Sequence, residues 1–508
     1  MRESDQEIDA KSQQQRKLPN NMDEEMDMIE NLPDAMLLHI LSFLPAKDVL
    51  KTSILSKRWR HLWMSVSNLS FEEWRPDKFV MFMNSAERAM MCRDVPRIEK
   101  FSLSSHMLNS ACINALISNA LSFKVQDFSL RLVYVGVPIS LPHHLFSCPT
   151  LTVLNLEEVT QFPCTACLPN LKKVRLSCCL LPHQQSLLHF FSGCPKLQKL
   201  ILNRCFWRDA NLGFISTPMP EPVDITQLPS TTCLPDLKEL ELSFCLLPYG
   251  QSTVQFFGDC PKLQKLTLKE CHWGLAKCLY ISTPMLESVV ICDATSSSGC
   301  KVVISGSNIK SFSYHGDLRT TYCLCSSSIV DDAYIHVNSK GKIEREGREK
   351  EVAHRVHKLI MKCSNVKHLG LSPDTLEALA YAEELDFPVF QRLTRLELKR
   401  KSVDLSCRAL NRLLQKLPHL DCLDFRMGVF LSKKHKNFAL DPLPPCFLTQ
   451  LKIIKIHTSS LTDEELHAVG ILFRVSTVLE KVYISGGRLN KNKISMLARE
   501  SKFEIISM

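Results

Sequence analysis

A six-residue pattern of apolar and variable positions recurs along most of the chain. Its form is apolar, two variable, apolar, one variable, apolar. The last two apolar positions are two residues apart, so their side chains point to the same side of an extended strand. The first apolar residue lies on the turn that enters the strand and points inward too. Copies of the pattern begin at Ile98, Val125, Leu151, Leu171, Leu197, Leu237, Leu263, Leu286, Ile309, Val366, Leu393, Leu420, Leu451 and Leu479.

The spacing of these copies predicts a solenoid. Most neighbours are about 20 to 31 residues apart, which brackets the period of leucine-rich repeats. One unit cannot cover its apolar face, whereas stacked units share a continuous core and turn their variable residues onto the concave side of a curved parallel sheet. Longer gaps precede Leu237 and Val366, and each has room for a degenerate unit. In the second gap, VDDAYIHV at Val330 is a candidate strand, and apolar residues at helical spacing from Val352 to Cys363 predict a helix.

Many of the 22 cysteines have structural explanations within the repeats. Four of them follow the last apolar position by three residues, in a slot that takes Asn or Cys in leucine-rich repeats: Cys179, Cys205, Cys245 and Cys271. Cys164 and Cys167 form one CxxC, but no second pair stands at zinc-finger spacing. We therefore expect buried or loop thiols and no metal site. The stretch from Cys167 to Trp207 recurs from Cys233 to Trp273, matching at roughly 25 of 41 positions, which indicates a tandem duplication of two units.

The stretch from Leu32 to Trp63 is too short to bury its many apolar side chains against itself. Pro33 is suited to a helix start and Pro45 to the end of that helix. Asp48 and Ser56 are candidate caps for a second and a third helix. The result is a three-helix unit that is apolar on two sides. One side packs internally or on the first repeats, and the other requires a partner.

These residues resemble a near-complete F-box of the plant type. The matching segments are Leu32-Pro33-Asp34, Ile40 to Pro45, Lys47-Asp48-Val49 and Leu55 to Trp63. The resemblance implies binding to a Skp-type adaptor and, through it, to a cullin scaffold and a RING ubiquitin-ligase core. Carried over by position, the adaptor interface or its direct support consists of Leu32, Pro33, Ile40, Leu41, Leu44, Val49, Leu55 and Trp59. The alternative is a helical cap over the first repeat, but a cap ends in a polar outer face and this unit does not.

The C-terminal end resembles the FBD region that closes many plant F-box/leucine-rich-repeat proteins. The resemblance rests on the segments around Cys446, Leu451 to Ile456, Asp463 to Leu466 and Leu479 to Ile484. Their pattern predicts a strand, a helix capped by Asp463 and a second strand, which together would seal the open end of the solenoid.

Composition excludes several classes of protein. The 508 residues are 45% hydrophobic and carry a net charge of +9, a mild excess without the dense basic stripe of a nucleic-acid-binding protein. No apolar run reaches the length of a membrane span, and the N-terminus lacks the apolar core of a secretory signal. We therefore expect neither nucleic acid nor membrane as a partner, and an intracellular location in the cytoplasm, the nucleus or both.

The sequence contains no recognisable catalytic constellation. Motifs for nucleotide binding, zinc proteolysis and serine hydrolysis are absent, and His143-His144 is an isolated pair. We expect no catalytic residues and no cofactor. Substrate contacts are expected on the concave face, where a basic segment precedes an acidic patch. The candidates are Lys173, Arg175, Lys199, Glu239, Glu241 and Lys265, and a basic patch suits an acidic or phosphorylated partner segment.

These observations predict an α/β fold: a short three-helix F-box followed by a curved leucine-rich-repeat solenoid with parallel strands on the concave face. The expected division is a disordered tail over 1–28, the F-box over 29–75, the solenoid over 95–440 and FBD-like terminal repeats over 441–508. The expected function is a non-catalytic substrate receptor of an SCF-type (Skp–cullin–F-box) ubiquitin ligase, acting on an unidentified protein. The alternative is a repeat scaffold that assembles no ligase.

Overall fold

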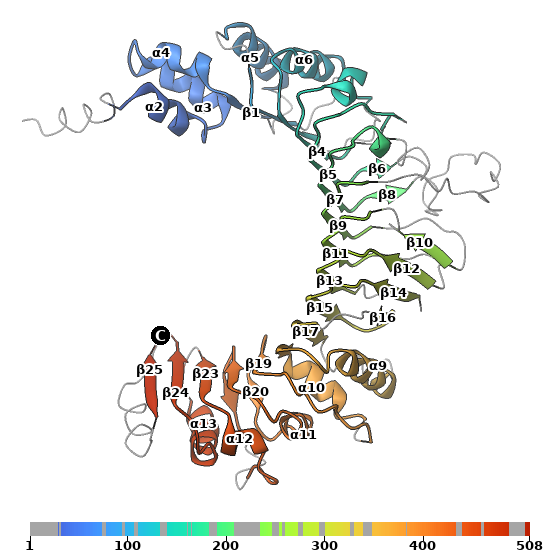
Figure 1. Cartoon of the computed structure of the whole chain (residues 1–508). Coiled ribbons are helices and arrows are strands. Elements are labelled where there is room, and N and C mark those ends of the chain that lie inside the picture. The colour runs from blue at the N-terminus through green and yellow to red at the C-terminus, as the bar shows by residue number, and fades with distance from the viewer. Residues whose placement is uncertain are drawn as a thin grey trace, which may run out of the picture.

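The computed structural model has the shape of a crescent, with short N-terminal helices at one tip and the C-terminal strand at the other (Figure 1). It describes residue 29 and residues 32–507, apart from 74–77, 94–96, 106–109, 133–139, 160, 164, 182–189, 208–233, 246–252, 257–259, 273–277, 294–299, 326–329, 339–347, 383, 433–438, 459–461 and 487–502. The predicted tail over 1–28 lies outside the described residues.

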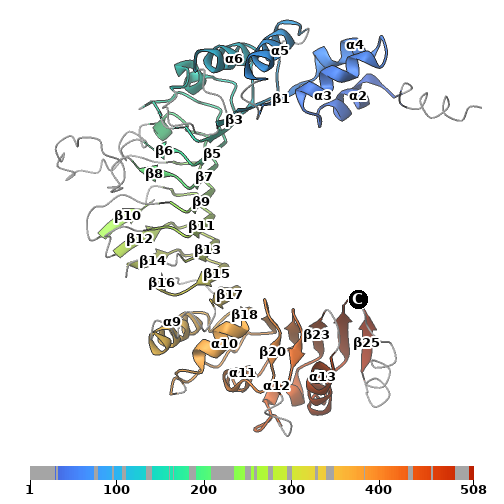
Figure 2. The ribbon, with the colours of Figure 1, turned by 180° about the vertical axis from the view of Figure 1, so that it is seen from behind.

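A 17-stranded sheet lines the inner side of the crescent (Figures 1 and 2). Each neighbouring pair is parallel, and the apolar position of one strand stands beside that of the next, as in Leu154, Val174 and Leu200. In chain order the strands are β1 (Asn68–Glu73), β2 (Lys100–Ser105), β3 (Asp127–Leu132), β4 (Val153–Glu157), β5 (Lys173–Ser177), β7 (Lys199–Asn203), β9 (Glu239–Ser243), β11 (Lys265–Lys269), β13 (Ser288–Cys292), β15 (Ser311–Gly316), β17 (Asp332–Val337), β18 (His368–Leu371), β19 (Arg395–Leu398), β21 (Cys422–Phe425), β23 (Ile453–His457), β24 (Lys481–Ser485) and β25 (Glu504–Ser507).

The predicted repeat pattern coincides with strands of this sheet. The two long gaps in the pattern differ in the strands that the structure describes within them. The second gap contains β17, the predicted strand, and the predicted helix is α9 (Glu349–Lys362), whose inward residues are buried. In the first gap, β7 pairs directly with β9. Most of that gap, 208–233, lies outside the described residues.

The outer side of the crescent is formed by helices in some parts of the chain and by strands in others. Helices α5 (Phe79–Met91) and α6 (Ser110–Ser122) back the first strands, and a parallel sheet of β10 (Thr253–Phe256), β12 (Cys278–Ser282), β14 (Lys301–Ser305) and β16 (Thr321–Cys325) backs the middle. From α9 onward, helices α10 (Pro373–Leu379), α11 (Arg408–Leu414), α12 (Pro445–Thr449) and α13 (Asp463–Val475) back the remainder. Two-stranded ladders β6–β8 (Leu180–Leu181, Phe206–Trp207) and β20–β22 (Val403–Asp404, Val429–Phe430) complete this side. The outer four-stranded sheet was not predicted.

The N-terminal helical unit, residues 32–67, has a small apolar core of its own. It consists of α2 (Asp34–Leu41), α3 (Ala46–Lys51), the 3₁₀ turn η1 (Thr52–Ile54), α4 (Trp59–Leu62) and the 3₁₀ turn η2 (Trp63–Ser65). The core comprises Leu37, Leu41, Val49, Trp59, Leu62 and Val66.

The helix caps predicted for this unit are wrong. Pro33 and Pro45 occupy the N-cap positions of α2 and α3, so Asp48 lies inside the first turn of α3, where its charge favours the helix dipole. Ser56 lies ahead of α4, whose N-cap is Arg58. Proline fits an N-cap because the extended backbone before a helix tolerates its ring and its missing N–H.

Apolar and polar contacts join the helical unit to the solenoid. Ala46 of α3 belongs to the large repeat core, and Trp63 packs against both cores. Arg93, after α5, donates from its guanidinium to the carbonyl of Val66. Burial lowers the pKa of Arg93 to about 10. The chain then enters β1, whose pairing with β2 makes it the first strand of the main sheet.

The turn after each central strand is built around a buried cysteine. The residue before it has a left-handed backbone: Cys178, Arg204, Phe244 and Glu270 have φ between 47° and 52°. This bend directs the thiols of Cys179, Cys205, Cys245 and Cys271 inward, where each donates to a carbonyl of the preceding strand at 3.4–3.5 Å. The predicted burial of these four cysteines is confirmed.

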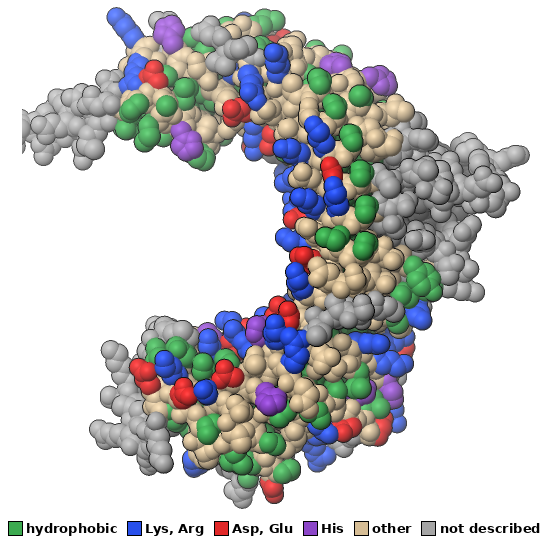
Figure 3. All heavy atoms as spheres, in the orientation of Figure 1, with side chains coloured by type: hydrophobic (Ala, Val, Ile, Leu, Met, Phe, Trp, Pro, Cys, Tyr) green, Lys and Arg blue, Asp and Glu red, His purple; other side chains and the backbone are tan. Residues whose placement is uncertain are grey.

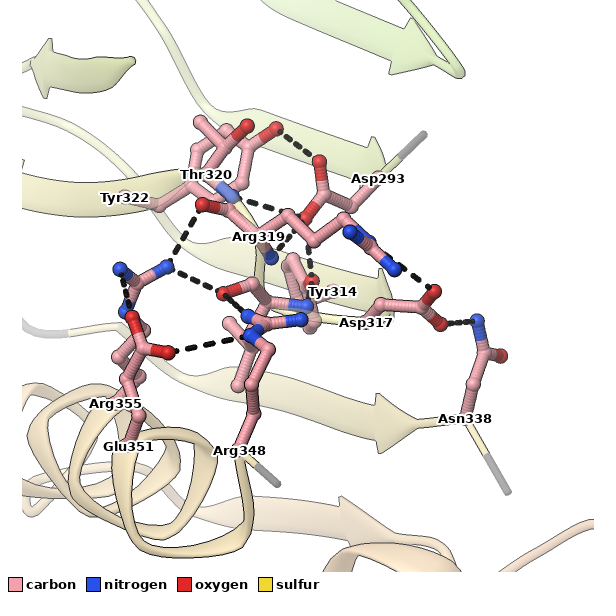
Figure 4. Close-up of polar contacts among 11 residues, drawn as sticks. Asp293, Tyr314, Asp317, Arg319, Thr320, Tyr322, Asn338, Arg348, Glu351 and Arg355 are labelled. Carbon is pink, nitrogen blue, oxygen red and sulfur yellow. Dashed lines mark hydrogen bonds and ion pairs between the residues drawn. The ribbon is translucent and has the colours of Figure 1, made fainter. Parts of the chain in front are cut away.

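A buried polar network marks the junction between the strand-backed and helix-backed repeats (Figure 4). The Asp293 carboxylate accepts hydrogen bonds from the hydroxyls of Tyr314 (3.1 Å) and Tyr322 (3.2 Å) and from the backbone N–H of Arg319 (3.1 Å) and Thr320 (3.4 Å). Burial, with the nearby Asp293 charge, raises the pKa of Tyr314 well above its ordinary value. On the other side of the same turn, Arg355 of α9 donates to the carbonyls of Leu318 (2.5 Å) and Arg319 (2.7 Å).

The C-terminal strand–helix–strand unit was predicted correctly, except for its cap. Thr462, not Asp463, is the N-cap of α13, and it forms a reciprocal capping box with Glu465. Asp463 is the first residue of the helix. Beyond β24 the chain adds β25, which was not predicted, and Phe503 beside it packs edge-on against Phe473 of α13, with ring centroids 4.6 Å apart.

We predict that the cysteines of the turns resist alkylation in the folded protein. Burial and the neighbouring Cys205 raise the pKa of Cys245 to about 12, so almost no thiolate forms at pH 8. Treatment of the native chain with iodoacetamide, followed by peptide mass spectrometry, should leave Cys245 unmodified. The exposed Cys92 should react, and both should react in urea. Equal labelling of Cys245 and Cys92 without denaturant would contradict the buried turn.

We predict that Asp293→Ala loosens the junction, because it leaves two buried hydroxyls and two backbone N–H groups without their acceptor. The cost should be at least about 4 kcal/mol, since four groups lose their acceptor and each buried unsatisfied group costs about 1–3 kcal/mol. Tyr322→Phe removes a single donor and should cost about 1 kcal/mol. Hydrogen exchange measured by mass spectrometry should show the loss of protection centred on 311–325. Unchanged exchange in Asp293→Ala would show that the network contributes no stability.

Candidate functional site

The adaptor-binding residues predicted from the sequence fall into two groups. Leu41, Val49 and Trp59 are buried in the small core and act as support. Five others reach the surface to differing degrees. Leu32 is partly buried, and Pro33, Ile40, Leu44 and Leu55 are exposed.

The apolar surface of the helical unit is larger than predicted. Met36 of α2, Phe43 after it and Ile54 of η1 are also exposed, with 74% of Phe43 and 85% of Ile54 accessible. Apolar side chains gather over this tip of the crescent in Figure 3. The sequence did not single out these three because the run is apolar on all sides of its short helices, so periodicity cannot separate inner from outer positions. We call Met36, Ile40, Phe43, Leu44, Ile54 and Leu55 the apolar tip.

Charged side chains frame the apolar tip without covering it. The guanidinium of Arg58 pairs with Asp34 at the start of α2 and donates to the carbonyl of Leu32 at 2.5 Å. Lys51 pairs with Asp48 at 2.7 Å. A surface with these exposed apolar side chains has the composition of a protein-binding site, with an apolar centre and a polar rim.

The charged residues predicted on the concave face form rows across the strands. Lys173, Lys199, Glu239 and Lys265 occupy one row, because each is the first residue of its strand and the register is unbroken. Arg175 and Glu241 belong to the next outward row. The predicted acidic patch is therefore not isolated, because Glu239 pairs with Lys199 (2.5 Å) and Lys265 (3.4 Å). Figure 3 shows the two signs interleaved along the concave edge.

A polar cleft of about 390 Å³ lies over β1–β5 at the N-terminal part of the concave face. Its floor carries short side chains, and the long side chains of Arg131, Glu157, Lys173 and Arg175 surround them. The sequence did not indicate this cleft, because it depends on which residues the register brings side by side. Lys173 and Arg175 are the two predicted substrate-binding residues that line it.

A second polar cluster lies on the concave face near the C-terminus. The carboxylate of Asp424, fully buried, pairs with Arg395 (2.6 Å) and lies 3.4 Å from both Arg426 Nε and His457 Nε2. His457 Nδ1 in turn is 2.6 Å from Ser485 Oγ. Although burial opposes it, the pairing with Asp424 raises the pKa of Arg395.

In chain order, Asp424, His457 and Ser485 match one arrangement of a hydrolase triad. The backbone around the serine and the charge beside the carboxylate differ from those of such a triad. Ser485 ends a regular strand, whereas a nucleophilic serine sits on a strained turn that exposes it. Arg395 also neutralises the carboxylate that would have to stabilise a charged histidine. We therefore assign the cluster to cross-strand pairing, which stabilises the last repeats.

Metal ligation finds no support among the described residues, which contain no group of three or more His, Cys, Asp and Glu side chains placed to hold an ion. Cys164 of the CxxC lies outside them, and His143 and His144 are exposed on the 3₁₀ turn η4 (His143–Ser147). In the part of the chain that the structure describes, no helix has both the length and the apolar character needed to cross a membrane.

Comparison with known proteins agrees with both parts of the architecture. Residues 29–71 match the model of the F-box domain, and residues 114–219 match the model of the leucine-rich repeats of FBD-associated F-box protein At5g56370. The chain is 31% identical to F-box/FBD/LRR-repeat protein At5g56420 of Arabidopsis thaliana over 257 residues, which cover 49% of this chain and 56% of the relative. It is 28% identical to F-box/FBD/LRR-repeat protein At4g26340 of the same plant over 322 residues, covering 62% and 70%. The chain spans about half the length of the first relatives that it matches.

The fold and these matches define a class of protein, in which an N-terminal F-box precedes a leucine-rich-repeat solenoid. Within that class the chain is similar to the F-box/FBD/LRR-repeat proteins of plants, which confirms the resemblance inferred from its sequence. The predicted fold class is confirmed as well.

We predict that Asp424→Asn destabilises the C-terminal repeats by about 2 kcal/mol. The substitution keeps the shape of the side chain but removes the fully buried carboxylate charge that pairs with Arg395, and it leaves Glu397 as the remaining carboxylate partner of Arg395 and Arg426. Asp386→Asn is the matched control, because Asp386 pairs with Lys416 at the same 2.6 Å but is 72% exposed. Solvent screens such a pair, so the control should show little change. Urea unfolding followed by circular dichroism measures both, and equal midpoints for the two variants would contradict the role given to Asp424.

Proposed function

We propose that this chain is the substrate-recognition subunit of an SCF-type ubiquitin ligase. In this role the F-box binds a Skp-type adaptor, which links it to a cullin and a RING core, and the concave face of the repeats binds a target protein. The single observation that carries the proposal is the apolar tip. Six exposed apolar side chains belong to a unit whose core is already filled by other residues.

The arrangement favours binding at two neighbouring surfaces over catalysis. The apolar tip lies on short helices at one end of the crescent, and the polar cleft lies on the neighbouring strands β1–β5. A subunit of this kind needs no catalytic residue, because holding a target lysine near a ubiquitin-charged enzyme raises its effective concentration. Partners of this class place the protein inside the cell, in the cytoplasm, the nucleus or both.

The proposed adaptor interface consists of the partly buried Leu32 and the exposed Pro33, Ile40, Leu44 and Leu55, supported from below by Leu41, Val49 and Trp59. The apolar tip adds Met36, Phe43 and Ile54 to that interface. The target-binding surface is proposed to include Lys173 and Arg175, with Lys199, Glu239, Glu241 and Lys265 further along the sheet. We also propose that the F-box ends at residue 75 and that the FBD-like terminal repeats begin at residue 441.

We predict that Phe43→Asp combined with Leu55→Asp abolishes binding to a Skp-type adaptor. Burying either side chain contributes about 1.5–3 kcal/mol, so the loss should exceed about 100-fold in affinity. Both residues are exposed in the free chain, so the variant should fold normally. Isothermal titration calorimetry with the purified adaptor gives the affinity, and size-exclusion chromatography gives the stoichiometry.

Val389→Asp is the matched control, because it places the same charge on an exposed apolar residue of the solenoid. It should bind the adaptor as the unaltered chain does. If the unaltered full-length chain forms no complex with the adaptor, the ligase proposal is wrong, and the alternative of a repeat scaffold that assembles no ligase replaces it.

A further inference from the structure

The outward face of helix α9 carries a row of basic side chains, which we call the α9 row. Its members are all exposed and stand four residues apart: Lys350, His354, Lys358 and Lys362. Residues at this spacing lie on one ridge of a helix, about 6 Å apart along its axis. In Figure 3, basic and histidine side chains gather over the part of the crescent where Figure 1 places α9. The row therefore runs from the first turn of the helix to the last.

The contacts that hold α9 on the solenoid use other residues of the helix. Its opposite face is buried in the repeat core. Arg355 donates to the carbonyl of Leu318 at 2.5 Å (Figure 4), and His357 donates from Nε2 to the carbonyl of Asp386 at 2.7 Å. None of these contacts uses a side chain of the α9 row, so packing of the helix does not account for the row.

The lysines of the α9 row form no ion pair with any residue that the structure describes. Glu351, which follows the first of them, is already paired with Arg348 (3.2 Å) and Arg355 (2.6 Å). The imidazole of His354 donates from Nδ1 to the carbonyl of Lys350 at 2.7 Å, which holds it beside the first lysine. The row is therefore a strip of positive charge that the neighbouring described carboxylates do not neutralise.

The α9 row works against the stability of its own helix. Like charges four residues apart, as at Lys358 and Lys362, repel each other. Lys350 lies in the first turn, where the helix dipole disfavours a cation. Only Lys362, in the last turn, is favoured by the dipole. The row as a whole therefore gains a favourable interaction only when an anionic partner lies along it.

We propose that the α9 row is a docking surface for an acidic helix of a partner protein, with carboxylates at every fourth position. Such carboxylates are spaced as the lysines are, about 6 Å apart along the axis. Ridges of residues four apart on two helices can also be aligned, in the commonest class of helix packing. Exposed ion pairs contribute little individually, so an apolar contact must add to them. Met361, which is 43% exposed and lies one turn after Lys358, offers that contact.

A single helix fits the α9 row better than a broad anionic surface does. The row is one residue wide, and Glu349 and Glu351 flank its first lysine. A membrane of anionic lipid would meet these carboxylates as well as the lysines. Met361 is the one exposed large apolar side chain of α9, all of which the structure describes, and one such side chain does not anchor a helix in a lipid layer.

The first test is cross-linking of the full-length chain to two alanine-based peptides that are stapled to keep them helical. Both contain four glutamates and one leucine. In the ordered peptide the glutamates stand at every fourth position with the leucine beside the last, and in the shuffled peptide the same residues are spread around the helix. A water-soluble carbodiimide joins a glutamate carboxylate to a lysine amine in contact with it as an amide, and takes up the released water to become a urea. Mass spectrometry then identifies each modified lysine.

The ordered peptide should cross-link to the three lysines of the α9 row at least about threefold more than the shuffled peptide does. Three exposed lysines of the solenoid outside α9 are the matched controls, and both peptides should modify them equally: Lys124, Lys172 and Lys238. Equal yields of the two peptides on the α9 row would overturn the ordered acidic helix as its partner. Cross-links concentrated on the control lysines would overturn α9 as the site.

The second test replaces all three lysines of the α9 row with glutamine. This variant should bind the ordered peptide at least about tenfold more weakly in fluorescence anisotropy, whereas a variant with the three control lysines replaced should bind it as the unaltered chain does. Its midpoint of urea unfolding should be unchanged or higher, because the substitutions remove repulsion within the helix. A lower midpoint would show that the lysines stabilise α9 and would overturn the docking role.

Sedimentation with vesicles that contain phosphatidylserine tests the other kind of partner. The unaltered chain should not sediment with them. Vesicle binding that is lost in the triple glutamine variant, together with no preference for the ordered peptide, would identify a membrane surface as the partner and overturn the acidic helix.

This inference does not rest on the proposed function, because α9 lies on the outer side of the crescent, away from the apolar tip and the concave face (Figure 1). A chain that binds no adaptor but prefers the ordered peptide would keep the docking surface and lose the ligase assignment. A chain that binds the adaptor and shows no such preference would keep the receptor role and lose the docking surface.

Discussion

The unbroken register of the parallel ladder is the constraint on which the rest of this structure depends. Apolar positions of consecutive strands stand beside each other from β1 to β25, so each repeat covers the core of its neighbours. No repeat has enough apolar surface to remain folded alone. The same register fixes the concave face, because a side chain there meets the residues at the same position of the two adjacent strands. Binding sites on such a surface are consequently rows that cross the sheet, and residues from five repeats form one cleft.

The apolar tip and the polar cleft place different kinds of chemistry on adjoining parts of the molecule. The tip has little charge at its centre and suits a partner that buries apolar area. The cleft has hydroxyls and guanidinium groups and suits an anion. They are connected through a short path, since α3 packs on the repeat core through Ala46 and the chain passes directly into β1. The contacts along this path include the guanidinium of Arg93, which donates to the carbonyl of Val66. In the proposed receptor, this connection would set where a target lies relative to the adaptor.

The features that recur at a regular spacing in the sequence were predicted. The features that depend on which strands pair with each other were missed. The strands, the inward cysteines and the inner face of α9 follow from spacing alone, and all are present. The outer sheet of β10, β12, β14 and β16 was missed because its four- and five-residue strands lie between repeat motifs and carry no pattern of their own. The caps of this unit were misassigned because the N-caps of α3 and α4 are Pro45 and Arg58, neither of which is a typical capping residue. The cleft could not be predicted, because Ser104 and Arg131 are 27 residues apart and become neighbours only through the register.

The tandem duplication also shows how a solenoid of this kind can lengthen. Copying two whole repeats preserves the apolar ladder, but it sets identical surface residues on nearby strands. Here Lys173 and Arg175 of the first copy correspond to Glu239 and Glu241 of the second, while Lys199 and Lys265 are unchanged. Four stacked lysines would repel one another, whereas the glutamate between Lys199 and Lys265 binds both. Divergence after gene duplication therefore acts differently on the two sides: the interior stays the same, and the concave surface changes sign where a glutamate can pair with the lysines beside it.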